Sequence, residues 1–239
     1  MKKTVFWEPE TSLFSVSDLK PQLASWDKAT HPAQLRLQSY LDALMSSLPP
    51  LPADARPLYL HLGIAVEHPA HLLKHHDLEN YLTPLFGARR LDSSRFVLVT
   101  ARKFVGGTSR LDVGTAQPRE EGLPDPEWGR FTYVAHGSTQ TRQWKENLRT
   151  ALAETNPRII ASAAAEVQIA WTCSTRRNWV SLWKPTGDCM GPILGEANPL
   201  RPFSPNDDRI VDLQLHRTLD ITMANAVGIE MRWQGSGRN

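Results

Sequence analysis

The chain has 239 residues, 41% of them hydrophobic, and a formal net charge of +2 at pH 7. This charge is compatible with nucleic-acid binding but does not require it. No stretch approaches the roughly 20 apolar residues of a membrane-spanning helix, so we expect no membrane partner. Cys173 and Cys189 match neither a metal knuckle nor a CxxC pair, which favours reduced thiols. The N-terminus lacks the apolar core of a signal peptide, and we expect a cytoplasmic protein.

The first predicted elements are a short strand, Thr4–Trp7, and a helix. One apolar face recurs at the helical period and consists of Leu37, Tyr40, Leu41, Leu44 and Met45. Pro32 suits the first turn of this helix. A long strand follows, because five apolar residues alternate with other residues: Leu58, Leu60, Leu62, Ile64 and Val66.

A short acidic segment, His76–Gly87, follows this strand and runs into an apolar helix. An acidic turn, Asp92–Arg95, then opens a predicted strand at Phe96–Lys103. A last strand at Arg110–Val113 completes this set of elements.

The same kinds of element recur later in the chain, in the same order. A strand at Phe131–Val134 is followed by a helix with Trp144, Leu148, Ala151 and Leu152 on one face, with Ser138 or Thr139 available as its cap. The next strand is predicted from alternation in four residues: Val167, Ile169, Trp171 and Cys173. An acidic segment, an acidic turn and two final strands follow: Thr186–Gly195, Asn206–Arg209, Ile210–Arg217 and Val227–Trp233.

This repetition predicts an α+β protein made of two similar halves. Each half would hold a small mixed β-sheet with one long and one short helix, and the two halves would form a pseudo-dimer. Turn-forming residues between Gly114 and Gly129 favour a linker. We therefore expect a first repeat at residues 1–119, a linker at 120–129 and a second repeat at 130–239.

The acidic segments resemble those of a known family. Clustered carboxylates repel one another and suit an oxygen-preferring cation such as Mg²⁺ or Mn²⁺. The segments Asp77-Leu78-Glu79-Asn80 and Asn206-Asp207-Asp208-Arg209 resemble motifs of the RusA-like Holliday junction resolvases. Subunits of that family are about half as long as this chain and pair as dimers, so the resemblance implies a fused tandem pair that acts as a monomer.

In the first half, the resemblance places Asp77 and Glu79 at the two helix-opening carboxylates of the family, and Asn80 at its asparagine. Thr83 stands where the family has its catalytic lysine, so that role is lost. Asp92 lies one position before the family's third carboxylate. The resemblance thus implies a metal and catalytic site at Asp77, Glu79 and Asp92.

In the second half, Asp207 falls on the third carboxylate, with Asp208 beside it. Asp188 matches either the second carboxylate or the asparagine, depending on the end from which the segment is counted. The implied second metal and catalytic site is Asp188, Asp207 and Asp208. Neither half holds the complete family set.

Basic residues flank both acidic segments and are candidate contacts for DNA, which the resemblance implies to be branched. They are Lys74, Arg89, Arg90, Arg176, Arg177, Lys184 and Arg209. Trp179 and Trp183 are candidates for stacking on an unpaired base. Two functional hypotheses follow: a Mg²⁺-dependent, structure-selective endonuclease, or a degenerate module that binds DNA or a protein as a subunit of a larger complex.

Simpler interpretations stay open for the acidic residues. Asp77, Glu79 and Asp92 could cap helices and turns, and the Asp207-Asp208 pair could mark a turn in an unrelated α+β protein. The run His75-His76-Asp77 could also be a metal site, although adjacent loop residues rarely supply two ligands to one ion.

Overall fold

Eight strands of the chain form one continuous sheet in the computed structural model, which describes residues 3–24, 27–54, 56–73, 77–87, 90–120, 127–198 and 200–236. The strands are β1 (Trp7–Leu19), β2 (Leu58–Val66), β3 (Phe96–Val105), β4 (Ser109–Pro118), β5 (Gly129–His136), β6 (Ala165–Cys173), β7 (Ile210–Leu219) and β8 (Ala226–Gly235). Their order across the sheet is β1-β4-β2-β3-β7-β6-β8-β5. The pairs β2–β3 and β6–β7 are parallel, and the other neighbouring pairs are antiparallel.

The prediction of two small sheets, one in each half of a pseudo-dimer, is wrong. Strands β3 and β7 pair in the middle of the single sheet, with Leu98 opposite His216 and Ala101 opposite Leu213. This pairing satisfies backbone groups that two separate sheets would leave at unpaired edges. Within the sheet, the order read inward from each edge is the same: β1-β4-β2-β3 on one side and β5-β8-β6-β7 on the other.

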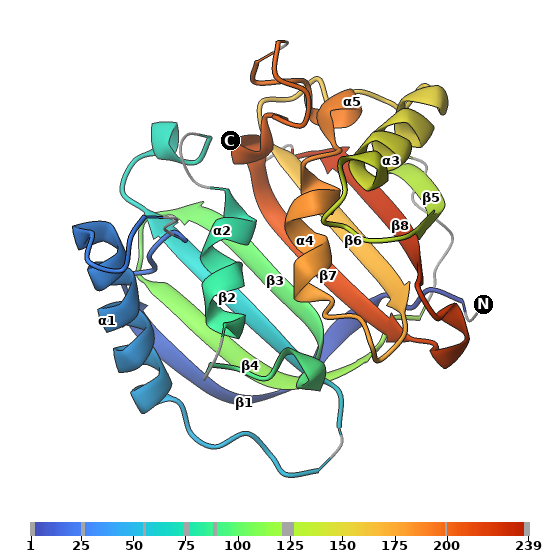
Figure 1. The fold of residues 1–239 in the computed structure, drawn as a ribbon. Helices are drawn as coiled ribbons and strands as arrows, with labels where there is room; N and C mark the ends of the chain where they lie inside the picture. The colour runs from blue at the N-terminus through green and yellow to red at the C-terminus, as the bar shows by residue number, and fades with distance from the viewer. Residues whose placement is uncertain are drawn as a thin grey trace.

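The helices lie together on one face of the sheet (Figure 1). They are α1 (Pro32–Ser47), α2 (Leu78–Leu82), α3 (Arg142–Glu154), α4 (Val180–Gly187) and α5 (Gly191–Leu194). Short 3₁₀ turns occur at Pro69–His71, Thr83–Phe86, Ser93–Arg95, Asp207–Arg209 and Ile221–Met223. Within the described residues, no helix has the length and apolar character needed to span a membrane.

The two long helices bury the faces that the sequence predicted. Leu37, Leu41 and Leu44 of α1 are buried, and so are Trp144, Leu148 and Leu152 of α3. The other predicted members of these faces, Tyr40, Met45 and Ala151, are partly buried against the core. Each helix begins at a side-chain cap: His31 Nδ1 accepts a hydrogen bond from the backbone of Ala33, and Thr141 Oγ1 accepts one from Trp144. The cap predicted at Ser138 or Thr139 was therefore wrong by two or three residues, because Ser138 starts the turn that precedes the helix.

Strand β1 and the start of the linker also differ from the predictions. The strand runs from Trp7 to Leu19 instead of Thr4–Trp7, and most of its residues are exposed or half-buried, so apolar alternation is absent. Its pairing with β4 is interrupted by register shifts. Gly114 belongs to β4 and not to a linker.

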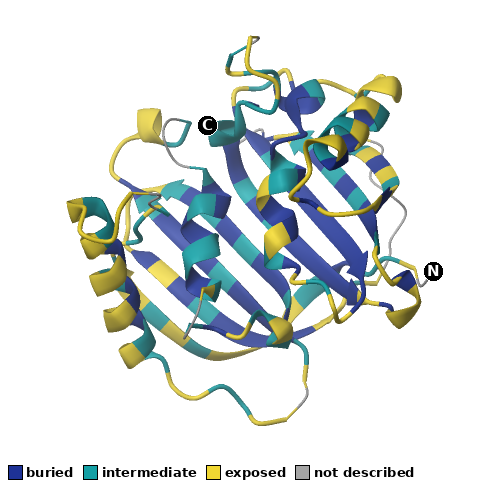
Figure 2. Ribbon diagram, viewed as in Figure 1, coloured by how far each residue is buried: buried dark blue, intermediate teal, exposed yellow. Residues whose placement is uncertain are grey.

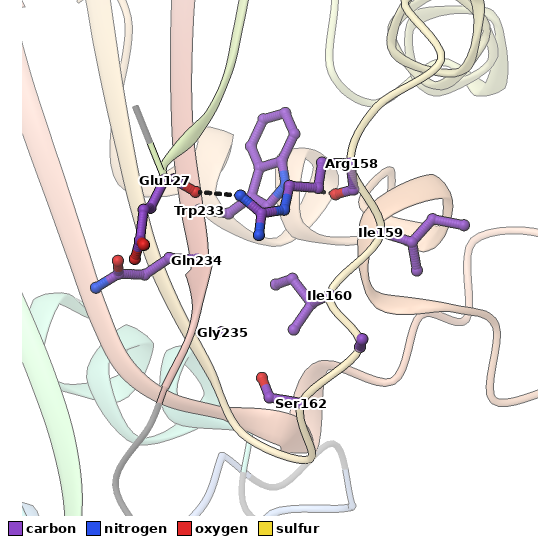
Figure 3. A pocket seen from close by; sticks show the side chains of 9 residues that line it. Glu127, Arg158, Ile159, Ile160, Ser162, Trp233, Gln234 and Gly235 are labelled. Carbon is purple, nitrogen blue, oxygen red and sulfur yellow. Dashed lines mark hydrogen bonds between the residues drawn. The ribbon is translucent and has the colours of Figure 1, made fainter. Parts of the chain in front are cut away.

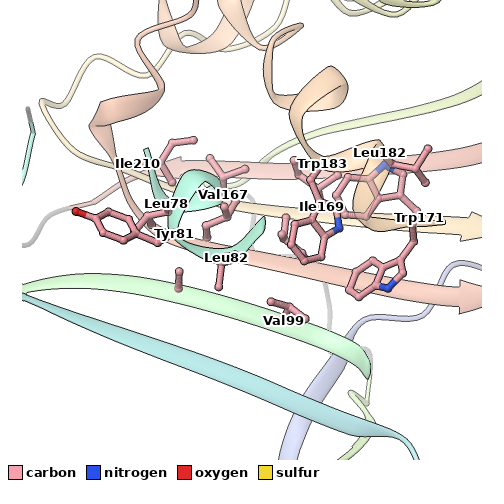
Figure 4. Close-up of a cluster of buried hydrophobic side chains, with 14 of the residues drawn as sticks. Leu78, Tyr81, Leu82, Val99, Val167, Ile169, Trp171, Leu182, Trp183 and Ile210 are labelled. Carbon is pink, nitrogen blue, oxygen red and sulfur yellow. The ribbon is translucent and has the colours of Figure 1, made fainter. Parts of the chain in front are cut away.

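The core lies between the sheet and the helices, and the strand residues that face the helices are buried (Figure 2). Helices α2 and α4 pack side by side over the central strands, where Leu82 and Trp183 meet residues of the sheet such as Val99 and Ile169 (Figure 4). Phe86 follows α2, and Trp183 lies in α4. The centroids of their rings are 5.5 Å apart, and the ring planes meet at 87°. Both cysteines are free and buried.

Candidate functional site, an acidic cluster closed by a lysine

The fold brings acidic residues of distant segments to one end of the central strand pair. Strand β7 is antiparallel to β3, so the turn that opens β7 lies beside the end of β3. Asp207 is in that turn, and Asp77 is the N-cap residue of α2, with Glu79 in the first helical turn. Asp188 is the residue at the C-terminal end of α4. We call Asp77, Glu79, Lys184, Asp188 and Asp207 the acid–lysine cluster.

Lys184 of α4 is the cation around which this cluster is arranged. Its Nζ lies 3.1 Å from Glu79 Oε1, 3.1 Å from Asp188 Oδ1 and 3.8 Å from Asp207 Oδ2. The other Asp188 oxygen, Oδ2, is 3.1 Å from Nζ of Lys145. One lysine therefore joins a carboxylate of α2 to carboxylates that lie more than 100 positions later in the chain.

The protonation equilibria of the cluster reflect burial and crowding. Burial raises the pKa of Glu79, and the ammonium of Lys184 opposes this rise. Burial, followed by repulsion from Asp77, raises the pKa of Asp207 to about 7. Burial alone lowers the pKa of Lys184, but the carboxylates of Glu79, Asp188 and Asp207 raise it overall, so this lysine stays charged.

Glu79 is the most enclosed carboxylate of the cluster. The residue is 9% exposed, and its Oε1 accepts a hydrogen bond of 3.1 Å from the ammonium of Lys184. Its charge is balanced by the ion pair to Lys184. Asp77, by contrast, accepts a hydrogen bond of 3.0 Å from the Asn80 amide. A buried carboxylate with so few hydrogen bonds depends on a nearby cation.

A third lysine, Lys103 of β3, lies beside the cluster. Its Nζ donates a 2.6 Å hydrogen bond to the backbone carbonyl of Asp208. Burial lowers the pKa of Lys103 to about 8, although Asp208, Asp77 and Asp207 act in the opposite direction. Lys103 also lines a cavity of about 890 Å³, whose wall includes Leu72.

The opposite end of the central strand pair is built in a similar way but with different chemistry. Arg217 of β7 donates to the backbone carbonyl of Ser94, as Lys103 does to Asp208. The indole of Trp179, at the start of α4, donates a 2.9 Å hydrogen bond to the carbonyl of Ser93. An arginine and a tryptophan thus occupy the corner that is equivalent to the acidic one.

The first predicted metal set is not brought together. Asp92 caps the turn that opens β3 and accepts hydrogen bonds of 2.9 Å and 2.8 Å from the backbone and hydroxyl of Ser94. Asp77 lies near Lys103, at the other end of β3. At the rise of an extended strand, this end is roughly 20 Å from the turn that holds Asp92. Asp92 is therefore a turn cap, as the simpler interpretation of the sequence expected.

The second predicted set is brought together in part. Asp188 and Asp207 both approach Lys184, whereas the contact recorded for Asp208 is the one between its backbone carbonyl and Lys103. The structure instead combines two residues of the first set, Asp77 and Glu79, with Asp188 and Asp207 of the second.

A lysine lies among the carboxylates that were expected to hold a divalent ion. The oxygen donors of the cluster have the right chemistry for Mg²⁺ or Mn²⁺. However, the ammonium of Lys184 already lies between Glu79, Asp188 and Asp207. Among the residues that the structure describes, no group of three or more His, Cys, Asp or Glu side chains is placed to hold a metal.

Several of the predicted DNA-binding residues have internal partners. Arg209 donates to backbone carbonyls that include those of Ile160 and Leu194, at 3.0 Å and 2.6 Å. Arg90 pairs with Asp42 at 2.7 Å, and Lys184 belongs to the acid–lysine cluster. Trp179 and Trp183 are 1% and 2% exposed, so neither can stack on a base in this conformation. Lys74, Arg89 and the pair His75-His76 lie outside the described residues.

Arg176 and Arg177 differ from these residues because they line an open pocket of about 310 Å³. Arg177 Nη2 donates to the carbonyls of Gly137 and Asn225 at 2.6 Å and 2.5 Å, which fixes its guanidinium at the pocket wall. Arg176 is exposed. Arg176 is thus open to an external anion, and Arg177 is held beside it at the wall of the same pocket.

A smaller cavity of about 210 Å³ lies beside the end of β8 (Figure 3). Arg158 donates a 3.0 Å hydrogen bond to the backbone carbonyl of Glu127, and Trp233 donates one of 2.8 Å to the carbonyl of Arg158. These bonds hold the chain segments around the cavity together, and they give its polar groups a structural role.

Sequence reasoning missed the lysines of the site. Lys184 was assigned to DNA, and neither Lys103 nor Lys145 was singled out. One signal was present for Lys103: it continues the buried alternation of Val99 and Ala101 on β3, a position where a charge needs a partner. The position of Lys184 depends on α4 packing beside α2, which no local pattern reports.

Comparison with known protein families and with curated proteins finds no match to this chain.

Proposed function

We propose that the chain is a nucleic-acid-binding protein of RusA-like type that does not cut DNA by a metal-dependent reaction. The observation that carries the binding part is the open pocket with two arginines, Arg176 and Arg177. Guanidinium groups present several N–H donors in a plane and suit phosphate oxygens. Ser138 also lines the pocket, and a serine hydroxyl can donate a further hydrogen bond to a phosphate.

The acid–lysine cluster supports the second part of the proposal. Metal-assisted cleavage of a phosphodiester requires ions that orient water and stabilise the developing charge. Lys184 satisfies Glu79 and Asp188 at 3.1 Å each, and so competes directly with an ion for these oxygens. We therefore favour the degenerate module over the endonuclease as the functional assignment.

The test measures binding and cutting in the same samples. Fluorescently labelled four-way junctions and linear duplexes are incubated with the full chain in EDTA, Mg²⁺ or Mn²⁺. Fluorescence anisotropy then reports binding, and a denaturing gel reports cleavage. We expect binding that weakens with salt, is stronger for the junction and occurs equally in EDTA, with intact DNA throughout.

The variant that tests the pocket is Arg176→Ala. Loss of one phosphate contact should weaken binding about five- to tenfold and reduce the salt dependence by the equivalent of about one released counterion. Arg36→Ala, which removes another exposed arginine from α1, serves as the matched control and should bind like the unchanged chain.

Two outcomes would contradict the proposal. Metal-dependent cutting that disappears in Asp77→Asn or Asp207→Asn would establish the endonuclease instead. Failure to bind either DNA would overturn nucleic-acid binding and leave a protein partner as the alternative role.

A further inference from the structure

The acid–lysine cluster gathers four carboxylates around Lys184, with two further lysines beside them. Asp77, Glu79, Asp188 and Asp207 converge there, and Lys184 and Lys145 both pair with carboxylates of the cluster. Lys103 lies next to the same carboxylates, so four acidic groups face three ammonium groups in a small volume. The raised pKa values of Glu79 and Asp207 are the electrostatic consequence of this crowding and of burial.

Glu79 gives an independent indication that the cluster needs a cation at its centre. The residue is 9% exposed, and its Oε1 accepts a hydrogen bond from Lys184 Nζ at 3.1 Å. An isolated carboxylate in such surroundings is strongly unfavourable without a positive partner. Lys184 is the partner that the chain supplies.

We propose that the Lys184 ammonium is the resident cation of the cluster and excludes a divalent metal ion from it. A Mg²⁺ or Mn²⁺ ion bound by these carboxylates would lie about 2.0 to 2.2 Å from their oxygens. The ammonium is held between the same oxygens of Glu79 and Asp188, and the two cations would repel each other at that distance. Replacing Lys184 with a neutral residue opens the cluster to a divalent ion.

This inference rests on the geometry of the cluster and not on nucleic-acid binding, so either can fail without the other. The experiment uses the full chain and Mn²⁺ alone as the probe. The unchanged chain, Lys184→Ala and Lys184→Gln are freed of metal and titrated with Mn²⁺, and the electron paramagnetic resonance signal reports the free ion. Thermal unfolding is recorded in parallel, because an ion that binds only the folded state raises the melting temperature.

We expect Lys184→Ala to bind one Mn²⁺ ion at least tenfold more tightly than the unchanged chain does, and to be stabilised by it. The double variant Lys184→Ala/Asp207→Asn should lose most of that gain, since it removes one of the carboxylates. Lys145→Ala is the matched control, because it also removes one positive charge beside Asp188 but leaves Lys184 in place. It should bind Mn²⁺ no better than the unchanged chain.

The outcomes that overturn the inference are specific. Equal Mn²⁺ affinity in Lys145→Ala and Lys184→Ala would mean that net charge alone controls binding. Equal affinity in the unchanged chain, or no binding in either Lys184 variant, would show that Lys184 does not exclude the ion. If Lys184→Ala unfolds without metal, recovery of its fold on adding Mn²⁺ supports the inference, and Lys184→Gln, which keeps hydrogen-bond donors near Glu79, provides the folded comparison.

Discussion

At the scale of single residues, Asp207 shows how the fold changes the chemistry of a surface-type side chain. Burial and the neighbouring Asp77 raise its pKa to about 7, and Lys184 at 3.8 Å only partly offsets them. The folded state thus holds a proton on Asp207 over a pH range in which the unfolded chain has released it. Such a group favours folding most strongly at low pH, and its contribution is lost as pH rises toward 7.

The corresponding prediction concerns Asp207→Asn. Asparagine does not ionise, so the variant should escape the loss of stability that the unchanged chain undergoes between about pH 4 and pH 7. We expect its free energy of unfolding, measured in urea, to exceed that of the unchanged chain by at least about 1 kcal/mol at pH 8, because a change of one in pKa corresponds to about 1.4 kcal/mol. The advantage should shrink toward pH 4.

Asp92→Asn is a control in which the change in stability with pH is expected to have the opposite sign. Hydrogen bonds from Ser94 lower the pKa of Asp92, so its ionised form contributes stability above the unfolded pKa and loses it as pH falls. This variant should be less stable than the unchanged chain at neutral pH. An advantage of Asp207→Asn that is constant across the pH range would contradict the assigned cause.

At the scale of elements, the predictability of each helix and strand follows the strength of its burial. The apolar faces of α1 and α3 are buried on the helical period, and the alternating apolar residues of β2 and β6 are buried together with most of the residues between them, so the sequence predicted these elements. Strand β1 has no such period, because it lies at the edge of the sheet and most of its side chains are exposed or half-buried. Its pairing with β4 depends on the backbone more than on side-chain pattern.

Gly114 of β4 provides a test at this scale. A Cβ at this position would collide with the carbonyl oxygen of Thr11 in β1 and with the ring of Tyr59 in β2. We expect Gly114→Ala to lower the free energy of unfolding by about 1 to 3 kcal/mol, the usual cost of overpacking. Chemical denaturation followed by circular dichroism measures this change.

Gly187→Ala is the matched control, because a Cβ there meets no atom within 4 Å. It should leave stability within about 1 kcal/mol of the unchanged chain or raise it slightly, since alanine is the better helix former. Equal effects of the two substitutions would show that the close approach of β1 and Tyr59 does not constrain Gly114.

At the scale of the whole molecule, the pairing of β3 with β7 makes the two halves of the chain depend on each other. Side-chain contacts reinforce the pairing at both ends, through Lys103 with Asp208 and Arg217 with Ser94. Separation of the halves would expose two strand edges and part of one continuous apolar core.

We therefore expect the full chain to unfold in one cooperative transition. Unfolding in urea should give coincident curves by tryptophan fluorescence, which reports mainly on the second half of the chain, where six of the eight tryptophans lie, and by far-ultraviolet circular dichroism, which reports on the whole sheet. Two resolved transitions, or a fragment of residues 1–119 that unfolds cooperatively by itself, would show that the halves are independent.

The sequence by itself determined the local elements and the positions of the acidic segments along the chain. Apolar periodicity predicts which face of a helix or strand is buried, because apolar side chains are buried away from water whichever element packs against them. The sequence also showed that carboxylates stand at the start of α2 and directly before β7.

Only the tertiary structure decided which of these segments meet. In the fold, β3 pairs with β7 in one sheet, and Asp92 and Asp77 lie at opposite ends of β3. Lys184 lies among Glu79, Asp188 and Asp207. The physical reason is that strand pairing and charge compensation are long-range. Their free energy depends on which groups lie within a few ångströms after folding, and no local pattern records that distance.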